Sequence, residues 1–226
     1  MEYLALYRKY RPAALEEMVG QSEIRKIIAS SIKNGTISHA YLFSGPRGTG
    51  KTTTAKIMAK MVNCEHLVDD NPCNECASCL SVASGSDIIE IDAASNNGVD
   101  EIRDLREKAN LVPSICKYKV YIIDEVHMLT NQAFNTLLKT LEEPPENVIF
   151  ILATTEPHKV LPTILSRCQR FDFGRISRKD IEERLVDVLL CENVEYEDGV
   201  IELVSELCDG GMRDALSILD QTIAYA

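Results

Sequence analysis

The chain has 226 residues, of which 45% are hydrophobic, 24 are basic (Lys or Arg) and 35 are acidic, so its formal net charge is −11. This is the composition of a globular protein, and it excludes collagen-like and low-complexity chains. The acidic balance also argues against simple coating of nucleic acid, although residues 1–62 hold 10 basic and only 4 acidic side chains.

The sequence shows no sign of export or of a membrane span. No apolar stretch approaches the roughly 20 residues that a membrane-spanning helix needs. The first residues lack the basic start and apolar middle of a secretory signal. We therefore expect a cytoplasmic protein without a membrane partner, in which the eight cysteines serve metal binding, catalysis or packing rather than disulfides.

Short apolar runs alternate with helical patterns over residues 1–175, which is typical of a parallel sheet with crossover helices. Several runs are apolar throughout, as strands buried on both faces should be. We therefore predict a doubly wound α/β domain with helices flanking the sheet, and with strands at 40–44, 87–92, 119–124, 148–154 and 169–173.

The first of these runs leads into a loop that matches the phosphate-binding pattern G-x-x-x-x-G-K-[ST] without departure, and a helix is predicted at 53–62. In such a loop the backbone N–H groups converge on phosphates, the lysine reaches the β and γ oxygens, and the hydroxyl that follows it ligates Mg²⁺. The helix start adds the positive end of its dipole. We predict that a nucleoside triphosphate binds Gly45, Pro46, Arg47, Gly48, Thr49, Gly50, Lys51, Thr52 and Thr53, with Thr52 as the Mg²⁺ ligand.

Four cysteines with the spacing C-x8-C-x2-C-x2-C follow this helix: Cys64, Cys73, Cys76 and Cys79. Four thiolates suit a tetrahedral Zn²⁺ site without an open position, which would be structural. A four-cysteine iron–sulfur cluster has compatible spacing, and His66 could replace Cys64. We predict a zinc module at about 64–79, because so short and polar an insertion needs a metal to stay folded.

The remaining cysteines and the histidines form no recognisable catalytic arrangement. Cys116, Cys168, Cys191 and Cys208 are scattered, and we interpret them as small packing residues. No histidine is spaced with a serine or cysteine as a nucleophile pair would be. We interpret all four histidines, His39, His66, His127 and His158, as surface or packing residues.

The third apolar run ends in Asp124 and Glu125. An acidic residue at the carboxyl end of a strand beside the phosphate loop can support Mg²⁺, and a second carboxylate can orient and deprotonate an attacking water. We assign the first role to Asp124 and the second, that of a general base, to Glu125. Glu125 distinguishes a nucleotide-hydrolysing enzyme from a passive nucleotide sensor.

Two further polar residues follow strand-like runs. Thr155 ends the fourth run, where its hydroxyl could contact the γ-phosphate or serve only in a turn. Arg167 precedes the last run and is expected to lie far from its own phosphate loop. It is either a surface ion-pair partner or an arginine supplied across a subunit boundary.

After Gly174 the pattern is purely helical, with predicted helices at 179–191, 200–207 and 213–226. We predict a small all-helical lid domain at 176–226. Arg213 follows a flexible double glycine, where it either folds over the γ-phosphate or stays solvated. The helical pattern reaches the last residue without a stop signal, so we expect a fragment of a longer protein.

Together these motifs resemble the tau/gamma family of bacterial DNA polymerase III clamp-loader subunits, which belongs to the AAA+ ATPases. The resemblance covers essentially the whole chain. It rests on the phosphate loop, on the four-cysteine insertion, and on the segments 7–12, 19–21, 124–129, 138–145 and 166–168.

The resemblance implies that the nucleotide is ATP, with Thr155 as a first sensor and Arg213 as a second sensor. Arg167 would be an arginine finger that acts in trans on ATP held by a neighbouring subunit. Arg11, Pro12 and Val19 would contact the adenine. A C-terminal collar domain, absent from this sequence, would carry oligomerisation.

The implied function is that of an ATP-driven motor subunit. With other clamp-loader subunits it would load a sliding clamp onto primer-template DNA, in the bacterial cytoplasm and in association with the nucleoid. Two alternatives remain from the sequence: another oligomeric AAA+ DNA motor, for branch migration or helicase loading, or a nucleotide-binding scaffold that does not hydrolyse. The presence of Glu125 argues against the scaffold.

Overall fold

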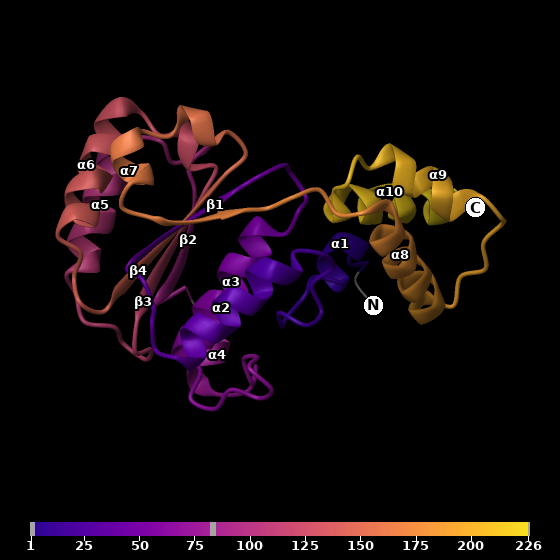
Figure 1. Ribbon diagram of the computed structural model, residues 1–226, viewed down its shortest axis with the longest axis horizontal. Coiled ribbons are helices and arrows are strands. Elements are labelled where there is room, and N and C mark those ends of the chain that lie inside the picture. Colours follow the sequence, from indigo (N-terminus) through magenta and orange to yellow (C-terminus); the bar gives the residue numbers. More distant parts are fainter. Residues whose placement is uncertain (1–2, 82–84, 226) are drawn as a thin grey trace.

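The computed structural model describes residues 3–81 and 85–225; Met1 and Ala226, the outer ends of the two predicted domains, lie outside these residues. Figure 1 shows a part built around a sheet and a smaller, purely helical part. The parallel sheet has the strand order β2-β3-β4-β1-β5 and helices on both faces, which confirms the predicted fold class. The strands are β1 (Ala40–Ser44), β2 (Ile88–Asp92), β3 (Lys119–Asp124), β4 (Val148–Thr154) and β5 (Gln169–Asp172).

The observed strands require two corrections to the predicted boundaries. β2 begins at Ile88 and not at Asp87, because Ile88 is the first residue in register with β3, opposite Val120; Asp87 precedes the strand and its carbonyl oxygen accepts the N–H of Val120 at 2.7 Å. β5 ends at Asp172, whose register partner Ser44 is the last residue of β1; Phe173 donates its N–H to the Ser44 carbonyl oxygen at 2.7 Å and lies outside the strand. The central strands β1, β3 and β4 are buried almost throughout, whereas the edge strands β2 and β5 alternate with exposed positions.

Several helices begin at side-chain caps. The Thr130 hydroxyl accepts the N–H of Ala133 at the start of one helix, and the Ser177 hydroxyl accepts that of Asp180 at another. The helix after the phosphate loop begins at Lys51, two residues before its predicted start, because it continues directly from the loop. The helical elements are α1 (Leu6–Lys9), α2 (Ser22–Lys33), α3 (Lys51–Asn63), α4 (Ala77–Leu80), α5 (Val99–Ala109), η2 (Val126–Met128), α6 (Asn131–Glu142), η3 (Pro157–Lys159), α7 (Pro162–Leu165), α8 (Arg178–Glu192), α9 (Val200–Leu207) and α10 (Met212–Tyr225).

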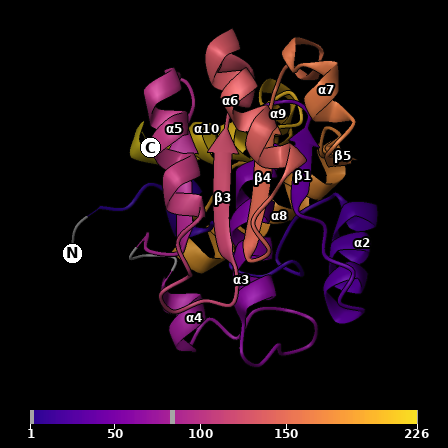
Figure 2. The same ribbon diagram turned by 90° about the vertical axis from the view of Figure 1, so that its left-hand side faces the viewer.

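Helices cover both faces of the sheet, as the ribbon in Figure 2 shows from a second side. Apolar side chains hold them there. On one face, Ile28 of α2 and Met58 of α3 pack in a cluster with Phe43 of β1. On the opposite face, α5, α6 and α7 pack against the sheet, with Ile102 and Leu137 fully buried. The carboxyl ends of the strands therefore lie between two helix layers, beside the phosphate loop.

The helices α8, α9 and α10 form the lid, which has its own apolar core. Leu185, Val204 and Leu216 bring all three helices into this core. Leu6 of α1 lies in the same cluster, so α1 packs on the lid before the chain reaches the sheet. Among the described residues, no helix is both long and apolar enough to cross a membrane.

Candidate nucleotide-binding site

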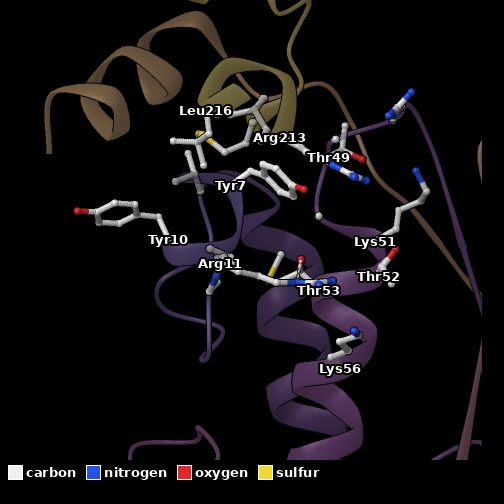
Figure 3. A pocket seen from close by; sticks show the side chains of 18 of the residues that line it. Tyr7, Tyr10, Arg11, Thr49, Lys51, Thr52, Thr53, Lys56, Arg213 and Leu216 are labelled. Carbon is white, nitrogen blue, oxygen red and sulfur yellow. Dashed lines mark hydrogen bonds between the residues drawn. The ribbon is translucent and has the colours of Figure 1, made fainter. Parts of the chain in front are cut away.

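A cleft of about 700 Å³ is lined by the lid, the phosphate loop and the strand ends beside it (Figure 3). Its size lies within the range of small-molecule sites, roughly 300–1,000 Å³. Three parts of the chain far apart in sequence line it: the N-terminal segment, the phosphate loop with the strand ends beside it, and the lid. Of the residues predicted from sequence, the cleft is lined by Arg11, Pro12, Val19, Arg47, Gly48, Thr49, Gly50, Lys51, Thr52, Thr53, Asp124, Glu125 and Arg213.

The phosphate loop closes around the ammonium group of Lys51. Its Nζ donates to the carbonyl oxygens of Gly45 at 2.8 Å and Pro46 at 2.7 Å, so these two residues hold the lysine and do not line the cleft. Burial lowers the pKa of Lys51, and the charges of Glu125 and Asp124 offset only part of that effect. The positive charge lies beside the N-terminus of α3, where phosphate oxygens are favoured.

Gly45 is required by packing. Its φ is +145°, and a Cβ there would lie 2.2 Å from the carbonyl oxygen of Phe173. No side chain can be accommodated at that distance. The first glycine of the motif therefore lets the strand β1 turn sharply beside the chain that leaves β5 for the lid.

Thr52 and Asp124, 72 residues apart in sequence, meet at the phosphate end of the cleft. The Thr52 hydroxyl donates to Asp124 Oδ2 at 2.8 Å, and Asp124 Oδ1 accepts the backbone N–H of Glu125 at 3.0 Å. A hydroxyl and a carboxylate beside a phosphate site are the oxygen donors that Mg²⁺ takes, together with phosphate oxygens and water. The residues present therefore fit the predicted ion.

Glu125 lies beside them in a left-handed backbone conformation, with φ of +47°. Its Oε2 accepts both the backbone N–H of Thr155 at 3.2 Å and the Thr155 hydroxyl at 3.0 Å. Glu125 lines the cleft, whereas Thr155 does not. The carboxylate of Glu125 therefore connects Thr155, which follows β4, to the cleft.

The cleft is also lined by residues that the sequence interpretation missed. The guanidinium of Arg213 lies 5.2 Å from the ring centroid of Tyr7, which brings a lid residue and an N-terminal residue together over the cleft (Figure 3). Arg11 Nε donates to the Thr53 hydroxyl at 3.3 Å. The lining residues not predicted are Tyr7, Arg8, Tyr10, Glu17, Met18, Lys56, Glu90, Ile176, Arg184, Met212 and Leu216.

Arg167 lies outside the cleft. Its Nη2 forms an ion pair with Glu142 Oε1 at 2.8 Å, and its Nη1 donates to the carbonyl oxygen of Thr163 at 2.7 Å. The Arg167 side chain is 34% exposed. These contacts fix the guanidinium at the surface, at a distance from the phosphate loop of its own chain.

The four predicted zinc cysteines converge, with their sulfur atoms all within 4.8 Å of one another. Cys73 Sγ and Cys79 Sγ are 3.9 Å apart, close to the roughly 3.8 Å that tetrahedral Zn–S bonds of about 2.3 Å require. Backbone N–H groups of Glu75 and Cys76 donate to Cys73 Sγ and lower the pKa of that thiol to about 7. The cysteines therefore fit a zinc ion.

Cys64 completes this cluster, whereas His66 contributes a backbone contact. The thiol of Cys64 lies 3.2 Å from the carbonyl oxygen of His66, and the N–H of Cys73 donates to Cys64 Sγ. Of the cysteines outside the cluster, Cys116 and Cys208 are buried, Cys168 is half-buried, and Cys191 is exposed and does not fit the packing interpretation.

The sheet order, the phosphate loop, the acidic strand end and the helical lid together define a P-loop domain with the AAA+ fold. Residues 20–177 match the family model described as DNA polymerase III, delta subunit, and residues 180–226 match DNA polymerase III clamp loader subunit, ATPase lid domain. The chain belongs to the DNA polymerase III clamp-loader family.

The relatives confirm the resemblance to tau/gamma subunits. The chain is 60% identical to DNA polymerase III subunit tau of Bacillus subtilis, over 100% of this chain and 40% of that protein. It is 45% identical to subunit tau of Escherichia coli, over 99% of this chain and 35% of that protein. The chain thus spans about 40% or less of the length of these relatives.

Solved structures show the same fold at low sequence identity. The RuvB Holliday junction branch migration motor of Thermotoga maritima superposes with a TM-score of 0.67 at 20% identity, over 96% of this chain and 68% of that chain. A DNA polymerase III gamma subunit-related protein of the same organism gives 0.56 at 20% identity, over 88% and 72%. Both likenesses support the AAA+ fold.

Proposed function

We propose that this chain is the ATP-hydrolysing part of a clamp-loader subunit, which loads a sliding clamp onto primed DNA together with other clamp-loader subunits. The observation that carries this proposal is the meeting of Lys51, the Thr52–Asp124 pair and Glu125 in one cleft beneath the lid. The family and the tau subunit relatives supply the biological setting. The site of action is the bacterial cytoplasm, at the nucleoid.

Binding of ATP would use the two sides of the cleft differently. Backbone N–H groups of the loop 45–53 and the ammonium of Lys51 hold the phosphates. Arg11, Pro12 and Val19, which line the cleft together with Tyr7, would contact the adenine. Arg213 belongs to the lid and its guanidinium contacts the ring of Tyr7. In this proposal it senses the γ-phosphate and links the position of the lid to the bound nucleotide.

Hydrolysis would proceed by in-line attack of water on the γ-phosphorus. Glu125 accepts a proton from that water, the bond between the γ-phosphorus and the β–γ bridging oxygen breaks, and ADP and phosphate leave. Thr52 and Asp124 would hold Mg²⁺, which would supply charge neutralisation on the phosphates. Thr155, which contacts Glu125, keeps the carboxylate in place as the first sensor.

Arg167 would act in trans. Its guanidinium lies outside its own cleft, held by Glu142 and Thr163. An arginine presented across a subunit boundary stabilises charge in the transition state and accelerates turnover by roughly 10³–10⁵ in related phosphoryl transfers. In the assembly, ATP binding would favour a spiral of subunits that holds the clamp open, and hydrolysis would release the clamp on DNA.

The test uses the full-length protein assembled with its partner subunits. ATP turnover should rise on addition of clamp and primer-template DNA. Glu125→Gln should keep ATP binding and abolish turnover, whereas Lys51→Ala should lose binding. Turnover that ignores the clamp would favour a different AAA+ motor, and undiminished turnover by Glu125→Gln would refute the general-base role.

The trans role of Arg167 has its own test in the same assembly. Arg167→Ala should retain ATP affinity while turnover falls, and Arg170→Ala, an exposed arginine paired with Asp172, should change neither. Mixing Arg167→Ala subunits with Lys51→Ala subunits should restore turnover only at interfaces that combine an intact arginine with an intact phosphate loop. A loss of ATP affinity in Arg167→Ala equal to that in Lys51→Ala would contradict a trans role.

A further inference from the structure

His127 lies two residues after Glu125, in the short helical turn η2, and its side chain is only 6% exposed. The sequence interpretation treated it as a surface or packing residue. The ring instead makes polar contacts on both sides. Its Nδ1 is 2.9 Å from the Thr154 hydroxyl and 3.3 Å from Glu125 Oε2, and its Nε2 is 3.4 Å from Glu156 Oε1.

The contact between His127 and Glu125 involves Oε2, the carboxylate oxygen that Thr155 already binds. Oε2 of Glu125 accepts the N–H and the hydroxyl of Thr155, and His127 Nδ1 faces the same atom. Within residues 3–81 and 85–225, no protein group donates a hydrogen bond to the other oxygen, Oε1. One carboxylate oxygen is therefore anchored, and the other is left to receive a proton from water.

Thr154 fixes the ring that makes this contact. Thr154 is fully buried at the end of β4, and its hydroxyl oxygen accepts the N–H of Glu156 at 3.0 Å. The Thr154 hydroxyl is within hydrogen-bond distance of Nδ1, the same ring nitrogen of His127 that faces Glu125. When Nδ1 carries a proton, it can donate to both oxygen atoms, whereas an unprotonated Nδ1 would turn its lone pair toward a carboxylate. The contact with Glu125 therefore requires the proton on Nδ1.

Charged groups surround the ring on its other side as well. Glu156, which faces Nε2, is itself paired with Lys159 at 2.8 Å and with His158 at 3.6 Å. The positive charge of Lys159 offsets the negative charge of Glu156 beside Nε2 of His127. The ring is thus clamped between the ends of β3 and β4, and its orientation is set by Thr154 and Glu156 rather than by Glu125 alone.

We propose that His127 is a positioning residue, which holds Oε2 of the general base Glu125 through Nδ1 and so aims Oε1 at the attacking water. The proposal rests on the proposed function, because it assigns Glu125 to proton transfer. A backbone with φ of +47° leaves Glu125 dependent on such contacts for its orientation. Among the described residues, no hydrogen bond or ion pair joins His127 to the phosphate loop, Thr52 or Asp124, so it should act on turnover and not on nucleotide affinity.

The test compares two amides in place of the imidazole, in the full-length protein assembled with its partners. The amide nitrogen of Asn can take the place of Nδ1, whereas that of Gln reaches the place of Nε2. We expect His127→Gln to lower kcat by about 10- to 100-fold, the range for a misplaced catalytic group, with the KM for ATP unchanged. His127→Asn should recover most of this loss.

A second pair of variants covers the case in which the histidine variants do not fold. Thr154→Val removes the hydroxyl that orients the ring and keeps the shape, and Thr154→Ser restores it; only the first should lower kcat. Equal activity of His127→Asn and His127→Gln, or a rise in KM with kcat retained, would overturn the proposal. If wild type does not hydrolyse ATP, or Glu125→Gln hydrolyses normally, the proposed function itself is wrong and the inference fails with it.

Discussion

The backbone N–H of Met212 donates a hydrogen bond to the carbonyl oxygen of Gly48 across 3.0 Å. Met212 begins the lid helix α10, and Gly48 lies in the middle of the phosphate loop. The residue before Met212 is Gly211, whose Cα would lie 3.0 Å from a Cβ at position 48. The lid therefore rests on the phosphate loop through main-chain atoms, at the loop that is proposed to hold the phosphates.

A larger side chain at position 211 should push the main chain of the lid away from that of the phosphate loop. A Cβ at Gly211 would lie 3.2 Å from the carbonyl oxygen of Arg47 and 3.2 Å from Asp214 Oδ2, so the branched side chain of Gly211→Val cannot be placed without movement. Overpacking of this kind costs about 1–3 kcal/mol, and we expect the Kd for ATP to rise by about fivefold or more. Equilibrium nucleotide binding measures the change.

Gly174→Val is the matched control. Gly174 lies in the connection to the lid, and a Cβ there would meet nothing within 4 Å. Its Kd for ATP should stay at the wild-type value. If Gly211→Val also binds ATP as wild type does, the contact between Met212 and Gly48 has no part in nucleotide binding.

The sequence was informative where local patterns determine structure. Three of the five strands have the predicted boundaries, because β1, β3 and β4 are short apolar runs buried in the centre of the sheet. The phosphate loop has a fixed spacing, so its residues could be named individually. The cysteine cluster could be found for the same reason, because its four thiols lie within 16 residues of chain.

The parts that sequence did not predict depend on contacts between distant segments. Tyr7 reaches the cleft because Leu6 is buried in the lid core, a pairing that no local pattern of α1 contains. His127 reaches Glu125 because the turn after β3 folds the ring against Thr154 of the neighbouring strand. Their positions follow from tertiary packing, which acts through residues more than twenty positions apart.

Loss of the predicted zinc ion should weaken nucleotide binding as well as local stability. Asn71 lies within the cysteine insertion, is 8% exposed, and accepts the backbone N–H of Leu15 at 2.8 Å. Leu15 leads directly to Met18 and Val19, which line the cleft. Without metal, the insertion loses its main crosslink, so we expect the segment before Val19 to loosen and the Kd for ATP to rise.

The experiment combines elemental analysis with binding. The purified protein should contain about one zinc per chain, and Cys76→Ser should contain less zinc, unfold at a lower temperature and bind ATP more weakly. Cys191→Ser, at an exposed cysteine outside the cluster, should resemble wild type in all three. Iron in place of zinc would contradict the metal assignment, and wild-type ATP affinity in a zinc-free protein would contradict the link through Asn71.

Asp87 should make stability depend on pH below neutrality. Its side chain is fully buried and accepts the N–H groups of Ser114 at 2.8 Å, Ile115 at 2.6 Å and Cys116 at 2.9 Å. Burial raises the pKa of Asp87, but the three N–H donors and the charge of Lys119 outweigh it, so the pKa lies below its ordinary value. The ionised carboxylate therefore stabilises the loop that joins α5 to β3.

The sign of the pH effect follows from that depressed pKa. The stabilisation is fully present above the unfolded-state pKa of about 4 and is lost as the pH falls through the lower pKa of the folded protein. Asp87→Asn replaces one acceptor oxygen by an NH₂ group that faces N–H donors, which should cost about 2 kcal/mol of unfolding free energy at pH 7. The difference in unfolding free energy between the variant and wild type should shrink as the pH falls below about 4.

Urea unfolding at a series of pH values measures this difference. Asp104→Asn, which changes an exposed carboxylate on α5, is the control and should stay close to wild type throughout. A deficit in Asp87→Asn that is the same at every pH would show that the loop depends on the shape of the side chain and not on its charge.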